Sequence, residues 1–421
     1  MLLIKTAKYW ENGLTRISTK ILGFTLGLAV LCMTGCSDTQ RPEMTKLDEN
    51  CEVSVIEPKV QETERIIEIT YELYKEAVEE NKLAELEVIR SIVNVLGENG
   101  YVAVDSRNQI DMTEPELVMQ FCEKVDTKKE AELTIIEVTY LGGFVEYNLQ
   151  TNDGNVEVVK NCYEYKNGNI QNTLTRNYSV DRWQYTDEGY LMFSGNWFSE
   201  ELHVLTLSEA EEHIAFRVQP LDEKCRELNR QYLLPISYEQ NNMFLVDWAE
   251  EDFGKLNFYD LFDIFYVKEN AKLVPYAPDK NLGIGAVYRI PKDEFESIIM
   301  KYFNIDSETL QGKTIYYPEE KTYEYKPRGF YEIEYPEYPY SEVVEFKENT
   351  DGTIKLIVNV VFPYVGNAKV YSHEVKVRPL EEGQVQYVSN HIIPSEYNSE
   401  PTWHTPRLTE EEWVEIYGGS E

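Results

Sequence analysis

The chain is poor in basic residues, and this shortage argues against several classes of function. Its 421 residues include 40 lysines and arginines against 75 aspartates and glutamates, which gives a formal net charge of −35. A nucleic-acid-binding protein needs a basic footprint, which this composition does not supply. The same acidity disfavours a folded surface that lies flat on an anionic membrane. Cations are natural partners of so acidic a surface, although solubility alone also explains it.

Long apolar runs and familiar catalytic motifs are also missing. The most apolar stretch, residues 21–31, has 11 residues, whereas a membrane-spanning helix needs about 20. No two of the six cysteines form a C-x-x-C pair, which argues against a zinc or thioredoxin-like site. A complete phosphate-binding loop, a G-x-S-x-G elbow and an H-E-x-x-H pair are absent. The sequence therefore predicts no cofactor and no recognisable catalytic site.

The N-terminus carries the most specific signal in the chain. Four basic residues precede the apolar stretch, and small residues then lead to Cys36. That order is typical of a secretory signal peptide. Thr34-Gly35-Cys36 resembles the end of the lipobox of bacterial lipoproteins, with Met33 where leucine is usual.

This resemblance implies a signal peptide over residues 1–35 and a diacylglycerol on the thiol of Cys36. The mature protein would then be anchored by lipid to the extracytoplasmic face of the cell membrane, because two or more acyl chains hold a protein stably. An uncleaved signal anchor is the alternative. Residues 36–57 are mostly polar and are predicted to be a flexible tether.

A first α+β domain is predicted over residues 58–275. Apolar residues recur every three to four positions from residue 66, which indicates helices. From residue 133 the period changes to two, and Gly142-Gly143 and Asn167-Gly168 separate the runs. Such pairs are strong signals for two-residue hairpins. We therefore expect an antiparallel meander with helices packed on one face.

A second α+β domain is predicted over residues 276–398, with Pro275 and Pro278 marking the boundary. A helix is expected from Lys292, and two long hairpins follow it. Element order alone suggests a cystatin-like or nuclear-transport-factor-like curved sheet. Residues 399–421 form a tail with a short helix that Thr409 caps.

Three stretches resemble a group of acidic, tyrosine-rich lipoproteins from Gram-positive bacteria whose function is unassigned. They are Asn257-Phe-Tyr-Asp-Leu-Phe-Asp263, Val287-Tyr-Arg-Ile-Pro291 and Tyr325-Lys-Pro-Arg-Gly-Phe330. The likeness covers most of residues 58–417. It implies a surface location and carries no catalytic residues to transfer.

Four cysteines remain after the lipidation motif. Cys51, Cys122, Cys162 and Cys225 are widely spaced. Outside the membrane they can form disulfides, in any of three pairings, or stay as free thiols.

The segment 316–340 combines tyrosine and proline more densely than any other stretch. Tyrosine offers a flat apolar face with a polar tip, which suits glycans or extended peptides. The predicted binding surface consists of Tyr323, Tyr325, Phe330, Tyr331, Tyr335, Tyr338 and Tyr340. The alternative is a rigid arm that covers the C-terminal sheet, its prolines blocking an edge.

One pair of histidines suggests a metal site. If Glu381-Glu382-Gly383 forms a three-residue hairpin loop, Val377 opposes Tyr387 and His373 opposes His391. Directly opposed side chains share a face with Cβ atoms about 4.5–5.5 Å apart. Two imidazoles at that range, with a nearby carboxylate, would hold a divalent metal.

The sequence as a whole favours a lipid-anchored, non-enzymatic surface protein of two α+β domains that binds a protein or a wall component. The alternative is an exported hydrolase with a site assembled from residues distant in sequence. A transporter's solute-binding lipoprotein fits the anchor but not the hairpins, because those proteins alternate strands and helices around a parallel sheet.

Overall fold

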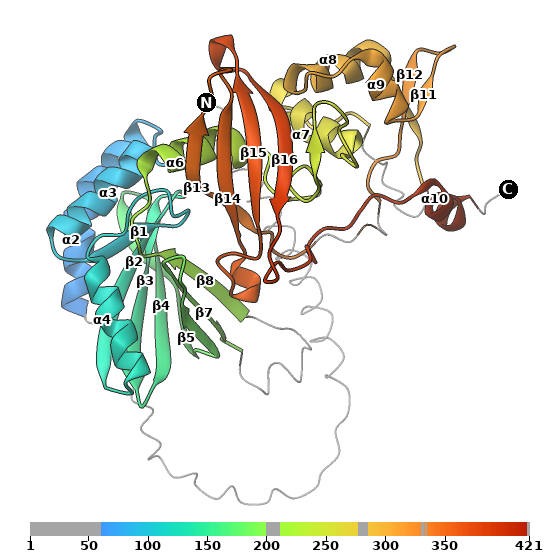
Figure 1. Ribbon diagram of the computed structural model, residues 1–421. Coiled ribbons are helices and arrows are strands. Elements are labelled where there is room, and N and C mark those ends of the chain that lie inside the picture. The colour runs from blue at the N-terminus through green and yellow to red at the C-terminus, as the bar shows by residue number, and fades with distance from the viewer. Residues whose placement is uncertain (1–59, 199–210, 277–284, 330–331, 333–334, 419–421) are drawn as a thin grey trace, which may run out of the picture.

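The computed structural model describes residues 60–198, 211–276, 285–329, 332 and 335–418 (Figure 1). The fold is α+β, as predicted, with helices packed on four mostly antiparallel sheets. Two halves follow each other along the chain. Here the N-terminal half means residues 60–218 and the C-terminal half means residues 223–418.

The N-terminal half is built on a five-stranded sheet of order β1-β2-β3-β4-β5. Its helices and strands are α2 (Val60–Glu79), α3 (Leu86–Glu98), β1 (Val102–Asp105), α4 (Pro115–Asp126), β2 (Ala131–Thr139), β3 (Gly143–Asn152), β4 (Asn155–Lys166) and β5 (Asn169–Ser179). The predicted meander from β2 to β5 is confirmed. β1 pairs with β2 in parallel, so the sheet is mixed and not purely antiparallel.

The hairpin turns follow from local backbone chemistry. Asn167 and Gly168 both have positive φ angles, 54° and 78°. Asp153 and Gly154 also do, at 50° and 84°. Two consecutive residues with positive φ make a type I′ turn, whose twist matches that of the flanking strands. Asparagine, aspartate and glycine tolerate this conformation best, and the turn sequence therefore determines the register of β3, β4 and β5.

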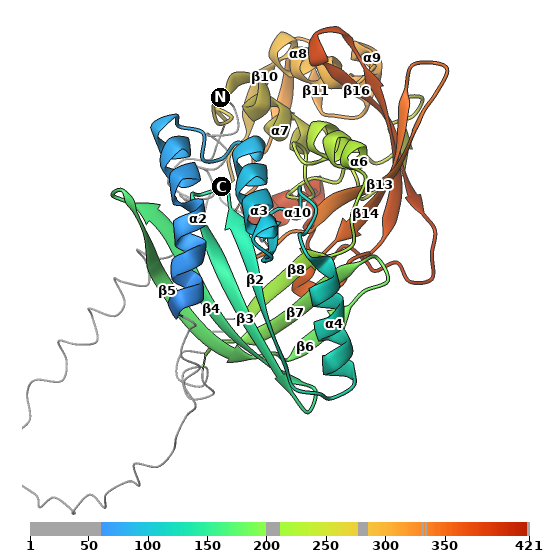
Figure 2. The same cartoon turned by 90° about the vertical axis from the view of Figure 1, so that its left-hand side faces the viewer.

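The two faces of this sheet carry different layers. Helices α2 and α3 cover one face around Ile136 and Phe144 (Figure 2). The opposite face packs against α4 and a second sheet of order β6-β7-β8, with Tyr147 and Phe216 in the shared core. That sheet consists of β6 (Arg182–Tyr185), β7 (Tyr190–Asn196) and β8 (Glu211–Arg217). The prediction of helices on one face only was therefore incomplete.

The C-terminal half has its own sheet, of order β13-β14-β15-β16-β9. Its strands are β9 (Trp248–Ala249), β13 (Tyr340–Glu348), β14 (Ile354–Val361), β15 (Ser372–Pro379) and β16 (Val385–Ile393). Helices α6 (Glu223–Leu228), α7 (Phe258–Asn270), α8 (Lys292–Tyr302) and α9 (Ser307–Gly312) accompany it, with the π-helix η1 (Asn229–Leu233) after α6. A small sheet joins β10 (Tyr288–Pro291), β12 (Thr322–Tyr325) and β11 (Tyr316–Tyr317).

One hydrophobic core runs through this half from Cys225 to Trp403. Residues 223–275 contribute to this core, although the sequence analysis assigned them to the first domain. β9 pairs with β16, and Phe262 of α7 stacks on Phe295 of α8. The hydrophobic cores therefore divide the chain near residue 220 and not at 275.

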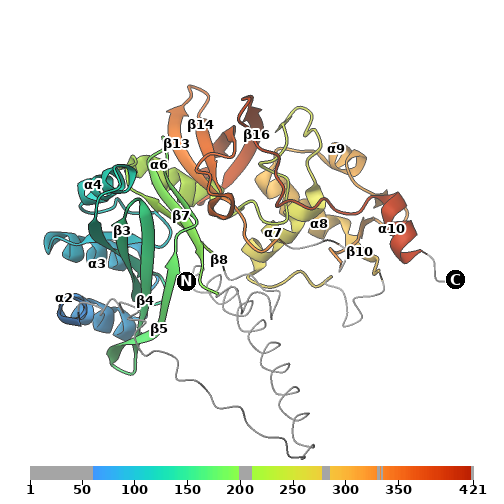
Figure 3. The same ribbon diagram turned by 90° about the horizontal axis from the view of Figure 1, so that it is seen from below.

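The two halves lie side by side, with α10 (Glu410–Tyr417) at the far end of the C-terminal half (Figure 3). Apolar contact between them involves Tyr190 and Met192 of β7 with Val361 and Ala368. The predicted cap of α10 is confirmed, because Thr409 and Glu412 form a reciprocal capping box. Within the described residues, no helix is both long enough and apolar enough to cross a membrane.

Candidate functional site

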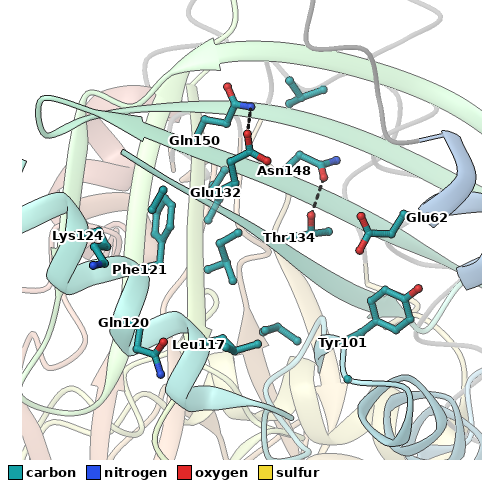
Figure 4. A pocket seen from close by; sticks show the side chains of 16 residues that line it. Glu62, Tyr101, Leu117, Gln120, Phe121, Lys124, Glu132, Thr134, Asn148 and Gln150 are labelled. Atoms are coloured by element: carbon teal, nitrogen blue, oxygen red, sulfur yellow. Dashed lines mark hydrogen bonds between the residues drawn. The ribbon is translucent and has the colours of Figure 1, made fainter. Parts of the chain in front are cut away.

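A groove of about 350 Å³ opens beside the N-terminal end of β2, between α2 on one face of the first sheet and α4 on the other (Figure 4). Its position follows from the sequence of β2 and β3. Ile136 and Phe144 lie under the helices, where the strands are apolar. Farther along the same face, β2 carries Thr134 and β3 carries Asn148. Helices do not cover this polar end of the sheet, and the groove results.

The lining combines neutral polar groups, a few charges and an apolar base. It consists of Glu62, Gly100, Tyr101, Val102, Leu117, Gln120, Phe121, Lys124, Ala131, Glu132, Leu133, Thr134, Asn148, Leu149, Gln150 and Val159. Leu117 is 40 % exposed, whereas Phe121 is buried. The lining holds one lysine and two glutamates, a formal charge of −1, so the groove is close to neutral in a very acidic protein.

Two cross-strand pairs organise the polar groups of the groove. Thr134 pairs with Asn148, and Glu132 with Gln150. The Thr134 hydroxyl donates to Oδ1 of Asn148 at 2.8 Å, and Nε2 of Gln150 donates to Oε1 of Glu132 at 3.2 Å (Figure 4). Directly opposed side chains in an antiparallel sheet share a face. Each pair therefore holds an amide in a defined orientation at the surface.

A buried carboxyl group lies next to the groove. Glu146 is on the same face of β3 as Asn148, two residues away, and only 2 % of it is exposed. The Thr63 hydroxyl donates to it at 3.0 Å, and burial raises the pKa of Glu146 to about 7. The group can exchange a proton near neutral pH. However, its enclosure keeps it from touching a ligand in the groove.

The lining contains no serine, cysteine or histidine. The groove therefore offers hydrogen bonds, a few charges and apolar contact, but no serine–histidine or cysteine–histidine pair. Its residues were not predicted from the sequence. Isolated threonine, asparagine and glutamine in alternation look like the solvated face of a strand, and only the position of the helices shows that they line a groove.

A second cluster of charges lies between the two sheets of the N-terminal half. Glu212 accepts hydrogen bonds from Lys160 at 3.0 Å and from Arg176 at 2.7 Å. Tyr147 donates to Glu137 at 3.4 Å, and burial raises the pKa of Glu137 to about 7. Side-chain partners for both carboxyl groups come from within the cluster. The groove does not include any of these residues.

The tyrosine-rich segment is mostly packing, not an open surface. Tyr323 and Tyr325 are buried, and their hydroxyls donate to Glu296 and Asp263. Tyr335, Tyr338 and Tyr340 are half-buried, and all three pack against neighbouring hydrophobic clusters. Phe330 and Tyr331 lie outside the described residues. The prediction that Tyr323 and Tyr325 belong to a binding surface was therefore wrong, because they fill the core under the small sheet.

The predicted histidine pairing was also wrong. Val377 does pair with Tyr387, but the register shifts by one residue after Lys376, so that His373 pairs with Ile392. His391 precedes Ile392 in β16, and successive side chains of a strand point to opposite faces of the sheet. His391 therefore faces the side opposite to His373. His373 is fully buried, and His391 is exposed. In the part of the chain that the structure describes, no three metal-ligating side chains gather into a cation site.

His373 instead belongs to a buried polar chain. The Tyr238 hydroxyl donates to Nε2 at 2.7 Å, and Nδ1 donates to Oδ1 of Asn390 at 2.6 Å. At neutral pH the imidazole is neutral because its pKa is low, and Nε2 is then the acceptor, since Oδ1 of Asn390 can only accept from Nδ1. Desolvation lowers its pKa to about 4.

The described cysteines are free thiols. Cys122 and Cys225 are buried, and Cys162 is partly exposed. Burial raises the pKa of each, which makes all three poor nucleophiles. Cys36 and Cys51 lie outside the described residues.

Two of the three stretches that carry the family resemblance meet in one ion-pair network. Asp260 of α7 is buried and accepts from Arg328 at 3.0 Å and from Arg407 at 2.6 Å. Arg407 also pairs with Asp263, which accepts from the Tyr325 hydroxyl. Two arginines pair with two aspartates, so the network carries little net charge. Because Arg407 belongs to the C-terminal tail and both aspartates belong to α7, the network fastens the tail to α7.

Comparison with known proteins places the chain in a family. Residues 56–407 match a family of unknown function, DUF6070, and the chain belongs to this family. A search of curated proteins and a search of solved structures each gave no match. The cystatin-like or nuclear-transport-factor-like comparison therefore stays a prediction.

Proposed function

We propose that this protein is a non-enzymatic binding module, held by a lipid on Cys36 at the extracytoplasmic face of the cell membrane. The groove between α2 and α4 is its ligand site. The ligand is a component of the surrounding cell surface, either a protein or a wall polymer.

The lining of the groove is the observation that carries this proposal. Binding sites combine an apolar base with a few well-oriented polar groups. Here Leu117 and Phe121 of α4 supply apolar contact, and the two cross-strand pairs orient Asn148 and Gln150. A volume of about 350 Å³ lies within the usual range for ligand sites, roughly 300–1,000 Å³.

The anchor comes from the sequence alone. The tether proposed for residues 36–57 lies outside the described residues. α2 begins at Val60, three positions after the end of that segment. The folded part would then work close to the membrane, where a ligand in the envelope is within reach.

An exported hydrolase is the second candidate, and Glu146 favours it. A carboxyl group with a pKa raised to about 7 is the usual signature of a general acid. A glycosidase also needs a second carboxylate across the scissile bond and direct access to the substrate. Because Glu146 is only 2 % exposed, binding is the better supported of the two functions.

Sedimentation with insoluble cell-envelope material tests the proposal. The purified protein should pellet with that material, and the double variant Asn148→Leu/Gln150→Met should pellet much less. Gln171→Met is the matched control, because Gln171 is an exposed amide of β5 that does not line the groove. Equal sedimentation of all three proteins would contradict a role for the groove. Release of soluble fragments, lost in Glu146→Gln, would favour the hydrolase instead.

A further inference from the structure

We infer that the ligand of the groove is a neutral, polyhydroxylated chain, that is, an uncharged glycan. This inference rests on the proposed function of the groove. It is drawn from the pattern of donors and acceptors that the groove presents and from its charge.

The two cross-strand pairs leave complementary groups on β3. Oδ1 of Asn148 already accepts from Thr134, so its Nδ2 amino group, with two N–H donors, is left to donate to a ligand. Nε2 of Gln150 already donates to Glu132, so its Oε1 is left to accept. The two residues lie two positions apart on one face of a strand, which separates them by roughly 7 Å. A donor and an acceptor therefore alternate along the groove.

A chain of hydroxyl groups fits this alternation. Each hydroxyl both donates and accepts, so it satisfies Asn148 and Gln150 in either direction of the chain. A peptide backbone has donors and acceptors in a fixed order and extends a sheet at an exposed edge. β1 pairs only with residues 135–138 of β2, so residues 131–134 of β2 form an open edge beside the groove, where a peptide could pair. The amides of Asn148 and Gln150 instead project from the face of β3, which has neighbours on both sides and cannot be extended by a peptide backbone.

The small formal charge of the groove disfavours strongly charged polymers. Glu62 and Glu132 outnumber Lys124 in the lining, so a polyphosphate or another polyanion would meet repulsion. A formal charge of −1 in the lining also gives a polycation little net attraction. Leu117, 40 % exposed at one wall, offers apolar contact for the C–H face of a sugar ring.

Titration calorimetry with defined soluble probes tests this inference. The probes are an N-acetylglucosamine hexasaccharide, a cellulose hexasaccharide, a neutral glycine-serine peptide and a poly(glycerol phosphate). We expect saturable binding of at least one hexasaccharide and none of the phosphate polymer. Asn148→Leu and Gln150→Met should each weaken that binding about 5- to 10-fold, since one hydrogen bond contributes about 1 kcal/mol. Gln171→Met should leave it unchanged.

Three results would overturn the glycan assignment: no binding of either hexasaccharide, binding that both groove variants leave intact, or preferential binding of the peptide or the phosphate polymer. Any of them leaves the proposed function standing if the envelope sedimentation still depends on Asn148 and Gln150. If that dependence fails as well, the groove is not the ligand site.

Discussion

The phenol oxygen of Tyr190 donates a hydrogen bond to Oε1 of Glu342 at 2.7 Å, and this bond joins the two halves of the protein. Both side chains are buried, and Arg217 lies 3.3 Å from the other oxygen of Glu342. A strand of the N-terminal half is therefore tied to a strand of the C-terminal half by a partly neutralised carboxyl group.

Tyr190→Phe should destabilise the protein by about 1.5–3 kcal/mol, because it leaves a buried carboxyl oxygen without its donor. Urea unfolding measures the change in the free energy of unfolding. Tyr397→Phe is the matched control, since Tyr397 is 80 % exposed and should change stability by less than about 0.5 kcal/mol. Equal effects of the two substitutions would show that the bond does not stabilise the contact between the halves.

The network around Asp260 predicts a larger effect. Arg407→Met should cost about 3–5 kcal/mol, because the aspartates lose a buried partner. The control is Lys355→Met, which breaks a 3.0 Å pair with Glu374 between side chains that are 36 % and 31 % exposed. Such a surface pair contributes at most about 1 kcal/mol. If urea unfolding gives Arg407→Met the same small loss as the control, the network does not anchor the C-terminal tail.

The buried His373 makes stability depend on pH in a defined direction. Its pKa is about 4 in the folded protein against about 6.5 in the unfolded chain. The unfolded state therefore binds more protons below pH 6.5, and the folded state loses stability as the pH falls from about 6.5 to 4. Between pH 7 and 4.5 the loss from this group is about 2 kcal/mol.

His373→Gln should remove this contribution, because glutamine keeps polar contacts but does not titrate. Between pH 7 and 4.5 the variant should therefore lose about 2 kcal/mol less of its unfolding free energy than the wild type loses. His391→Gln, on the exposed neighbour, should match the wild type. Glu146 acts in the opposite direction, since its raised pKa favours folding at low pH and the benefit is lost as the pH rises through about 7. The contribution of His373 is therefore seen more clearly from the difference in unfolding free energy between the variants than from the pH dependence of the wild type alone.

The lipid anchor predicts a change in location. Cys36→Ser should abolish labelling with a fatty-acid analogue and release or misprocess the protein, because the modified thiol is lost. Met33→Leu restores the usual lipobox residue and should keep labelling intact. Partition of Cys36→Ser into membranes with an uncleaved N-terminus would support the signal anchor instead.

Much of the fold could be predicted from local sequence. Asn167-Gly168 and its counterparts determine their turns through positive φ, and apolar periodicity located α2, α3 and α8. Two short strands could not be predicted from local sequence. β1 has four residues and pairs in parallel, and β9 has only two, yet β9 places residues 223–275 in the C-terminal half.

The candidate site was harder to predict because it depends on which helices and neighbouring strands pack against a given strand. One extra residue at a bulge separated His373 from His391 onto opposite faces, and no local pattern marks that bulge. Tyr323 and Tyr325 were predicted to form a binding surface. They are buried instead, because carboxylates of α8 and α7 accept hydrogen bonds from their hydroxyls. Asn148 and Gln150 acquire their role only because α2 and α4 leave that end of the sheet open.

Photo-crosslinking in living cells tests the central claim, that the groove holds a surface ligand, most directly. A photoreactive benzoylphenylalanine replaces Leu117, which is 40 % exposed at the wall of the groove, or Leu174, which is 39 % exposed on β5 and does not line it. The two sites are alike in residue type and exposure. We predict that the probe at position 117 captures one discrete envelope component and that Gln150→Met reduces this capture, whereas the probe at position 174 captures none. Equal capture at both positions, or capture at position 174 alone, would contradict the account.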